Sequence, residues 1–293
     1  MTITDEQRHE FRERGYLVLP GLIAPPLLEQ VAARAAEILA GGEGVVSRVS
    51  GSERRVLQKV AGLSRTDPVF GELAHYGPLV DAVEGLLGEP ALIFRDVMVV
   101  KPAREGAEFH WHQDSAYWDI EPRSLISAWV ALGDVPEGSG CLRFVPGTHL
   151  AEVEHDLPLG ETRRLPRPLA RLLRRLVSLA GTGDNPGGAG GNRVLYALKQ
   201  LVLGSATKAL PFLGNLGEYS VGQVEIDRLG IPPVSVPASA GTVVLFHSLL
   251  LHSSNPNTSD ADRPAPIVSY MGESFRFTGR GEASFDVARR SSD

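Results

Sequence analysis

The spacing of apolar residues in this chain follows two different periods on either side of about residue 90. In the first part, apolar positions recur at helical spacing after capping residues such as Thr4 and Pro25, which predicts helices. Glycines end these stretches, as at Gly15. The elements expected here are helices over 5–14, 25–40 and two short helices within 68–87 broken at Gly77-Pro78, and strands over 16–19 and 56–60.

Beyond residue 90 the apolar residues form short runs that are divided by glycine and proline. This rhythm is typical of strands joined by turns. It predicts a mainly β fold, an antiparallel architecture preceded by packing helices. The expected strands cover 92–100, 127–132, 142–145, 234–236, 242–246 and 267–271.

The pattern of short apolar runs that predicts strands is interrupted between residues 152 and 233. This segment holds a basic helical stretch over 163–175, the low-complexity loop Gly181–Gly191 and an apolar stretch over 194–213. Glycine-rich loops of this length are usually mobile or functional rather than part of a core. We interpret 152–233 as a helical and loop insertion, or lid, over a pocket mouth. A disordered surface excursion is the alternative for Gly181–Gly191.

The whole chain, residues 1–293, is expected to form one domain, because β sandwiches and barrels can reach about 250 residues as a single unit. Residues 1–90 would supply N-terminal helices and the first strands. Residues 91–151 and 234–273 would supply the β core, interrupted by the insertion.

Charge and cysteine content narrow the possible partners and compartment. The net charge of -6 and the pI near 5.8 disfavour nucleic acid and anionic membranes, which need clustered Lys and Arg. The single cysteine, Cys141, excludes an internal disulfide and fits a reducing cytoplasm. We see no signal peptide, and no apolar run reaches the ~18 residues that suggest a membrane span. We therefore expect a cytoplasmic protein with no nucleic-acid or membrane partner.

Two histidines and an aspartate point to a metal site. On a strand, residues i and i+2 face the same side, so His112 and Asp114 can both reach one ion. A third ligand, His252, must come from a distant strand. Two imidazoles and one carboxylate can occupy one face of an octahedral metal and leave the opposite face open, as in non-haem iron(II) oxygenases.

Other histidines leave an alternative ligand set open. His110 and His112 also share a strand face and can form a His-x-His pair of the cupin type, with a different metal. We favour the set that contains Asp114 and interpret His110 as a neighbour of the ligands or the substrate. His149 and His247 are expected to be structural.

Several short motifs follow one another in an order that is typical of one enzyme family. They begin with Lys101-Pro102 and His112-Gln113-Asp114, and they end with His252–Asn257 leading to Arg263. Through these motifs the chain resembles the phytanoyl-CoA dioxygenase-like family of iron(II)/2-oxoglutarate oxygenases from about residue 6 to 273, with the insertion as the poorly matched part. The motifs between them cover 127–132, 140–149 and 241–247.

The resemblance implies a fold, two co-substrates and their site. The fold would be a double-stranded β-helix, a cupin-like jelly roll whose sheets enclose iron(II). The far carboxylate of 2-oxoglutarate would be held by Arg263, because a guanidinium offers a planar, bidentate fork. Ser254 matches a hydroxyl that supports this carboxylate, and Trp129 matches a residue that lines the pocket. Lys59 falls near the family's upstream lysine, with a solvated strand residue as the alternative.

By the same resemblance, dioxygen would oxidise a small-molecule substrate with release of succinate and carbon dioxide. Hydroxylation is the outcome we favour, with desaturation, epimerisation and oxidative cyclisation as alternatives. Asp114 argues against halogenation, because halogenases of the superfamily replace this carboxylate with a small residue. Substrate contacts are expected from His110, Trp111, Tyr117 and Trp118.

The Ala/Arg/Gly-rich composition is typical of a high-GC bacterial gene. Oxygenases from such genes often act in secondary metabolism, including antibiotic biosynthesis. We expect a monomer or homodimer. The competing class is a non-catalytic jelly-roll binding protein, which damage to a metal ligand or to Arg263 would favour; all of these residues are present.

Overall fold

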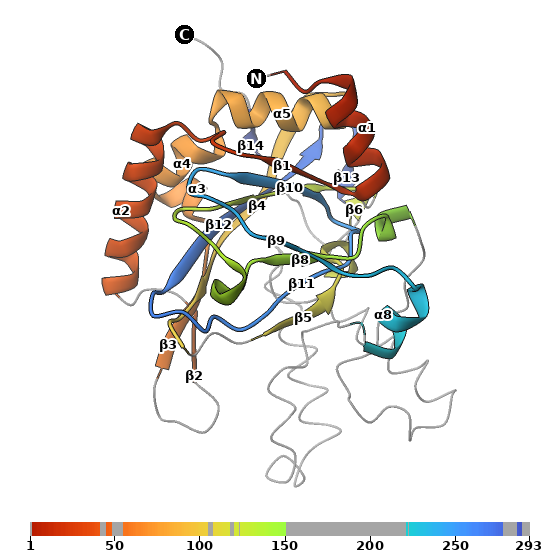
Figure 1. Cartoon of the computed structure of the whole chain (residues 1–293). Helices are drawn as coiled ribbons and strands as arrows, with labels where there is room; N and C mark the ends of the chain where they lie inside the picture. Colours follow the sequence, from red (N-terminus) through yellow and green to blue (C-terminus); the bar gives the residue numbers. More distant parts are fainter. Residues whose placement is uncertain are drawn as a thin grey trace, which may run out of the picture.

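Two antiparallel β-sheets pack against each other, and helices pack on the outer side of the larger sheet (Figure 1). This computed structural model describes residues 2–41, 45–48, 55–104, 108–117, 120–122, 124–150, 221, 223–277 and 286–288. The expected class, mainly β with packing helices, is confirmed. Most of the predicted insertion over 152–233 lies outside the described residues.

The larger sheet has eight strands. They are β1 (Tyr16–Leu19), β2 (Val45–Arg48), β3 (Arg55–Ala61), β4 (Ala91–Lys101), β7 (Ile126–Val130), β10 (Val243–His247), β12 (Arg263–Gly272) and β14 (Asp286–Val287). Their order is β1-β10-β7-β12-β4-β3-β2, with β14 paired to β4 beside this path. The long pairing of β4 with β12 runs through the middle of the sheet.

The smaller sheet has four strands. They are β5 (Phe109–His112), β8 (Leu142–Phe144), β9 (Val234–Val236) and β11 (His252–Ser254). Their order is β5-β11-β8-β9, so β11 lies between partners that are far from it in sequence. A two-stranded ribbon is formed by β6 (Ile120–Glu121) and β13 (Arg276–Phe277).

Five helices cover the outer face of the larger sheet (Figure 1). They are α1 (Asp5–Arg14), α2 (Pro25–Gly41), α3 (Leu63–Thr66), α4 (Pro68–Ala74) and α5 (Gly77–Leu87). Their apolar side chains, such as Val31 and Leu79, form one core with Ala128, Val130 and Leu245 of the sheet. The hydroxyl of Tyr270 on β12 donates to the carbonyl of Ala74 at 2.8 Å.

A second apolar core fills the space between the two sheets. Trp129 on β7 and Phe246 on β10 point away from the helices and pack with Leu142 and Phe144 of β8. Tyr16 stacks on Phe144 with ring centroids 4.6 Å apart. Because alternate strand residues face opposite sides, each large-sheet strand gives one face to the helices and the other to the inter-sheet space.

The elements expected outside the insertion are observed within a few residues, with one longer strand, whereas the helical stretch expected over 163–175 lies outside the described residues. The strand expected over 267–271 begins earlier, at Arg263, because β4 pairs with it along its whole length. The sequence does not predict this start, because Pro264 and Pro266 lie in it and proline normally marks a strand end. The short strands β2, β6 and β13 give no periodic signal. Helix α8 (Gln223–Leu229) is a described part of the predicted insertion.

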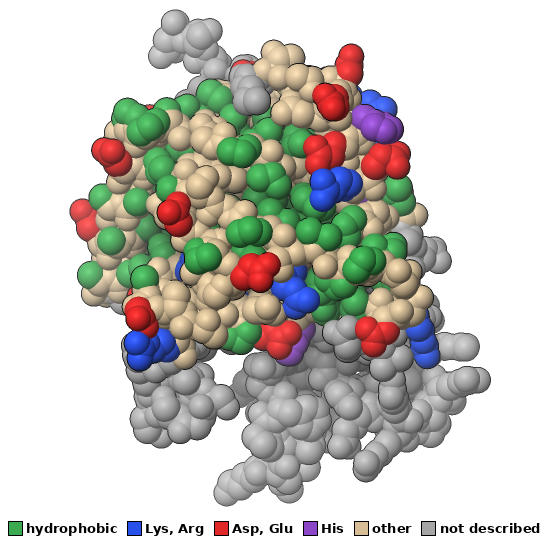
Figure 2. Space-filling view, viewed as in Figure 1, with side chains coloured by type: hydrophobic (Ala, Val, Ile, Leu, Met, Phe, Trp, Pro, Cys, Tyr) green, Lys and Arg blue, Asp and Glu red, His purple; other side chains and the backbone are tan. Residues whose placement is uncertain are grey.

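On the face shown in Figure 2, acidic and basic side chains lie interspersed among apolar ones. Large apolar side chains that stay exposed in the described part are Leu150, Ile231 and Val287. No helix in that part is long and apolar enough to cross a lipid bilayer.

Candidate metal site

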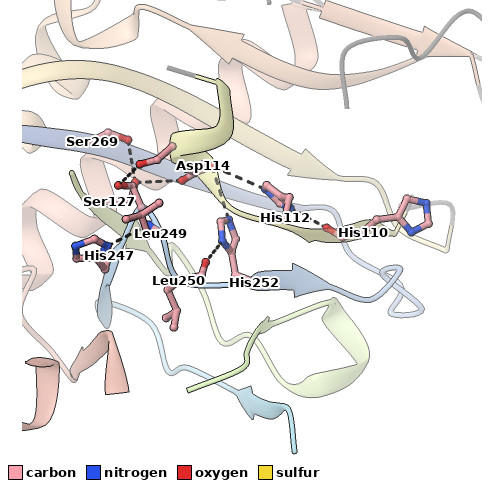
Figure 3. Close-up of polar contacts among 11 residues, drawn as sticks. His110, His112, Asp114, Ser127, His247, Leu249, Leu250, His252 and Ser269 are labelled. Carbon is pink, nitrogen blue, oxygen red and sulfur yellow. Dashed lines mark hydrogen bonds and ion pairs between the residues drawn. The ribbon is translucent and has the colours of Figure 1, made fainter. Parts of the chain in front are cut away.

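The pairing of β11 with β5 brings two histidines from distant parts of the chain together (Figure 3). His252 opens β11 and lies opposite His112, the last residue of β5. Asp114 follows as the first residue of the 3₁₀ helix η1 (Asp114–Tyr117). Within the described ranges, these three residues form the one group of histidine, cysteine and acidic side chains that could hold a metal ion.

The ligand atoms of this group are close enough to share an ion. Nε2 of His112 and Nε2 of His252 each lie 3.8 Å from Oδ1 of Asp114, and all three atoms lie within 4.8 Å of one another. Ligands about 2.1 Å from one metal in an octahedral face lie about 3 Å apart, so small side-chain shifts would close the site.

Backbone carbonyls fix the tautomer of both imidazoles. Nδ1 of His112 donates to the carbonyl of His110 at 2.7 Å, and Nδ1 of His252 donates to the carbonyl of Leu250 at 2.9 Å. The proton of each neutral ring is therefore on Nδ1, and the lone pair of Nε2 faces Asp114. Hydrogen bonds of this kind orient histidine ligands in metal sites.

Burial keeps the first of these imidazoles uncharged. Desolvation, and then the neighbouring His252, lower the pKa of His112 to about 3. The two rings are stacked obliquely, with centroids 4.1 Å apart. His112 is therefore neutral near neutral pH, which is the form that binds a metal.

Asp114 reaches the histidines from a turn, whereas we expected it on the strand of His112. That expectation is wrong, because β5 ends at His112 and Asp114 begins a 3₁₀ helix. Its outer oxygen, Oδ2, accepts a hydrogen bond from the Ser127 hydroxyl at 3.4 Å. Ser127 also shares a 3.0 Å hydrogen bond with Ser269 of β12. Oδ1 is thus directed to the imidazoles while Oδ2 is held by the large sheet (Figure 3).

Arg263 places a buried cation in the same inter-sheet space. It is 7% exposed, and its Nη2 donates to the carbonyl of Gly140 at 3.2 Å. Its Nε has no hydrogen-bond partner, and in the described part of the chain no carboxylate forms an ion pair with it. Desolvation lowers the pKa of Arg263 to about 10, so the group stays charged. A buried charge without an ion partner is costly.

The Arg263 guanidinium and the Asp114 carboxylate contact the same strand, β7. The guanidinium Cζ is 5.7 Å from the ring of Trp129 on β7. Ser127, which bonds to Asp114, precedes Trp129 by two residues and shares its strand face. Arg263 therefore lies beside Trp129 and Asp114 beside Ser127, at successive positions along the inter-sheet face of β7.

The other residues predicted to bind 2-oxoglutarate lie on β11 and β3. Ser254 is two residues after His252 on β11 and therefore shares its face. Lys59 on β3 has its Nζ 5.5 Å from the ring centroid of Phe109, the residue opposite Ser254 on β5.

Of the residues predicted to contact substrate, the two that the structure describes, His110 and Trp111, point in different directions. His110 is 63% exposed, and its ring points away from the ligand group (Figure 3). Trp111 lies on the other face of β5, buried with Val145, Ile226 and Leu251. The side chain of Tyr117 and the whole of Trp118 lie outside the described residues.

The two histidines expected to be structural pair with each other. The rings of His149 and His247 have centroids 5.2 Å apart. Nδ1 of His247 accepts the backbone N–H of Leu249, and Nε2 of His149 bonds to the carbonyl of Arg12. Neither belongs to the metal-ligand group.

Three polar residues at this site received no role from the sequence. Ser127 bonds to the Asp114 carboxylate, Ser269 bonds to Ser127, and the buried Lys101 bonds to the carbonyl of Ser254. Two of them are partly indicated by the sequence, because Ser127 and Lys101 lie in motifs that carry the family resemblance. Their partners depend on strand register, which a single sequence does not reveal.

Comparison with known proteins gives a consistent result. The chain matches the family described as Phytanoyl-CoA dioxygenase (PhyH) over residues 11–265. It is 26% identical to L-proline trans-4-hydroxylase of Streptomyces griseoviridis, over 87% of this chain and 82% of the relative.

Solved structures with a similar fold include EctD and SnoN. EctD from S. alaskensis, with 2-oxoglutarate and 5-hydroxyectoine, has a TM-score of 0.67 at 19% identity and covers 98% of this chain and 87% of that one. The epimerase SnoN, in complex with Fe3+, alpha ketoglutarate and nogalamycin RO, has a TM-score of 0.63 at 23% identity and covers 95% and 87%. Because the family match spans most of its length, the chain belongs to the phytanoyl-CoA dioxygenase family, and the expected enzyme class, an iron(II)/2-oxoglutarate-dependent dioxygenase, is confirmed.

Proposed function

We propose that His112, Asp114 and His252 hold iron(II), and that the gap between this group and Arg263 receives 2-oxoglutarate. The proposal depends on the buried Arg263 guanidinium, which lacks a carboxylate partner among the described residues and lies over Trp129, two residues after the Ser127 that bonds to Asp114. A dicarboxylate with one end on the metal can place its other end on this cation.

The side chains present suit both ligands. Each imidazole offers a neutral Nε2, and Asp114 offers Oδ1, so half of an octahedral shell is filled and the rest stays open. Arg263 can bind the far carboxylate through two N–H groups. Ser254 would support that carboxylate, Trp129 would line the pocket, and Lys59 would add positive charge.

With dioxygen, the bound iron and 2-oxoglutarate would supply the oxidant and release succinate and carbon dioxide. We propose hydroxylation of a small-molecule metabolite, in bacterial secondary metabolism, by a cytoplasmic enzyme. The likeness to the epimerase SnoN supports epimerisation as the alternative outcome at the same site.

We further interpret the two sheets as a double-stranded β-helix that encloses the site in a single domain. Their shared core between β7, β10 and β8 supports this architecture. The insertion over 152–233 stays a predicted lid. Its described end packs on the outer face of the smaller sheet, where the backbone N–H of Val221 donates to the carbonyl of Trp111 at 2.6 Å.

The experiment that tests this function is a succinate-release screen with iron(II), 2-oxoglutarate and candidate metabolites. A substrate should raise succinate release well above the uncoupled background and yield an oxidised product. A chain that binds metabolites but never forms succinate would instead be the non-catalytic binding protein.

Loss of any one metal ligand should abolish the iron and 2-oxoglutarate complex. Under anaerobic conditions the wild type should show a weak visible charge-transfer band with both ligands, and His112→Ala, Asp114→Ala and His252→Ala should each remove it. His110→Ala is the matched control and should keep the band. Loss of the band in His110→Ala, with its retention in Asp114→Ala, would instead favour the cupin-type ligand set.

Arg263→Gln should weaken 2-oxoglutarate binding by about 10- to 100-fold, because charged hydrogen bonds contribute about 1.5–3 kcal/mol. Iron affinity should stay unchanged, as followed by anaerobic titration with each ligand. Arg65→Gln, which removes a surface arginine paired with Asp286, is the control for charge. Equal 2-oxoglutarate affinity in Arg263→Gln and the wild type would remove Arg263 from the site.

Ser127→Ala should lower iron(II) affinity by about tenfold, because residues that orient metal ligands typically contribute 10- to 100-fold and this hydrogen bond is long. Ser115→Ala removes another buried serine, which bonds to Ser248, and should leave iron affinity unchanged. Calorimetric titration under anaerobic conditions measures both. An unchanged affinity in Ser127→Ala would show that Asp114 needs no support from the large sheet.

A further inference from the structure

Lys101, the last residue of β4, points its charged side chain into the protein. It is 1% exposed, although lysine is rarely buried to this degree. Desolvation, followed by the nearby Arg263, lowers the pKa of Lys101 to about 7. Burial of an ammonium group is unfavourable unless specific contacts compensate for it.

The Lys101 ammonium is bonded to the backbone just after the metal ligand His252. Nζ donates to the carbonyl of Ser254 at 3.1 Å and also to the carbonyl of Asn255. These two carbonyls mark the end of β11 and the start of the turn that follows it. The contact therefore connects the large sheet to the strand that carries Ser254.

Lys101 also lies beside Arg263 on the neighbouring strand. The two residues are direct partners in the pairing of β4 with β12, so their side chains leave the sheet on the same face. The Nζ of Lys101 is 4.9 Å from the ring centroid of Phe109, over which the Nζ of Lys59 also lies. Lys101 thus lies between Arg263, which is proposed to bind the far carboxylate, and the Phe109 ring that Lys59 also contacts.

Gly140 joins these contacts into one packed cluster. Its φ is +71°, and a Cβ there would lie 2.9 Å from Cδ of Lys101 and 2.5 Å from the carbonyl oxygen of Asn255. The carbonyl of the same glycine accepts the hydrogen bond from Arg263. The methylene stem of Lys101 therefore packs against the backbone that orients the Arg263 guanidinium.

We propose that Lys101 is a positioning residue for 2-oxoglutarate: its ammonium fixes the end of β11 and its stem supports Gly140, which together hold Ser254 and Arg263 in place for the far carboxylate. The inference rests on the proposed function of Arg263. It assigns a role to a buried charge that the metal chemistry itself does not use.

The test is Lys101→Met, which keeps an unbranched apolar stem and removes the ammonium. Iron(II) affinity should stay within about twofold of the wild type, while 2-oxoglutarate affinity should fall by about 10-fold or more, the effect typical of residues that orient ligands. With a substrate from the succinate screen, KM for 2-oxoglutarate should rise while kcat at saturating 2-oxoglutarate changes little.

Tyr270→Phe is the matched control, since it removes another buried side-chain hydrogen bond to a carbonyl, on the helix-facing side of the neighbouring strand. It should lower stability without changing 2-oxoglutarate affinity. Lys101→Gln, which keeps a neutral donor, should bind 2-oxoglutarate with an affinity between Lys101→Met and the wild type.

These measurements separate the proposed function from the role of Lys101. If the wild type itself binds no 2-oxoglutarate, the proposed function is wrong. If the wild type binds it and Lys101→Met binds it equally well, only the role of Lys101 is overturned. The role is also overturned if Tyr270→Phe weakens binding as much as Lys101→Met, or if both Lys101 variants fail to fold, since Lys101 would then act through general stability.

Discussion

The hydrogen-bonded pairing of β11 with β5 is the contact on which the rest of the site depends. It places His252 opposite His112, although strands β6 to β10 and the predicted insertion lie between them in the sequence. A shift of this register by one residue would turn the His252 side chain to the opposite face, because strand side chains alternate. The register is supported on the other side by β8, whose Phe144 lies opposite His252.

A second constraint is the burial of positive charge between the sheets. Arg263 and Lys101 are partners across β12 and β4, and both are almost fully buried. Like charges directly opposite each other on paired strands are destabilising, and their burial adds an unfavourable desolvation free energy. An anion bound beside them would offset both effects. The fold therefore carries an unfavourable arrangement at the point where a carboxylate would bind, as is common at ligand sites.

The sequence predicted the helices and most strands, because their periods come from burial on one face. It also identified His112, Asp114 and His252, which the structure brings together. The secondary structure at Asp114 was predicted wrongly, because nothing in a short polar segment distinguishes a strand from a 3₁₀ helix. The roles of Ser127 and Lys101 could not be predicted, because their partners are set by pairing between distant strands.

In the proposed complex, one iron ion joins β5 and β11 to a 2-oxoglutarate molecule that Arg263 holds at its far end. The most direct measurement is a crystal structure from anaerobic crystals with iron(II) and 2-oxoglutarate, with iron located by its anomalous signal. We predict iron about 2.0–2.2 Å from Nε2 of His112 and of His252 and from an oxygen of Asp114, and the far carboxylate on Arg263. Iron bound through His110, or 2-oxoglutarate placed away from Arg263, would contradict this account.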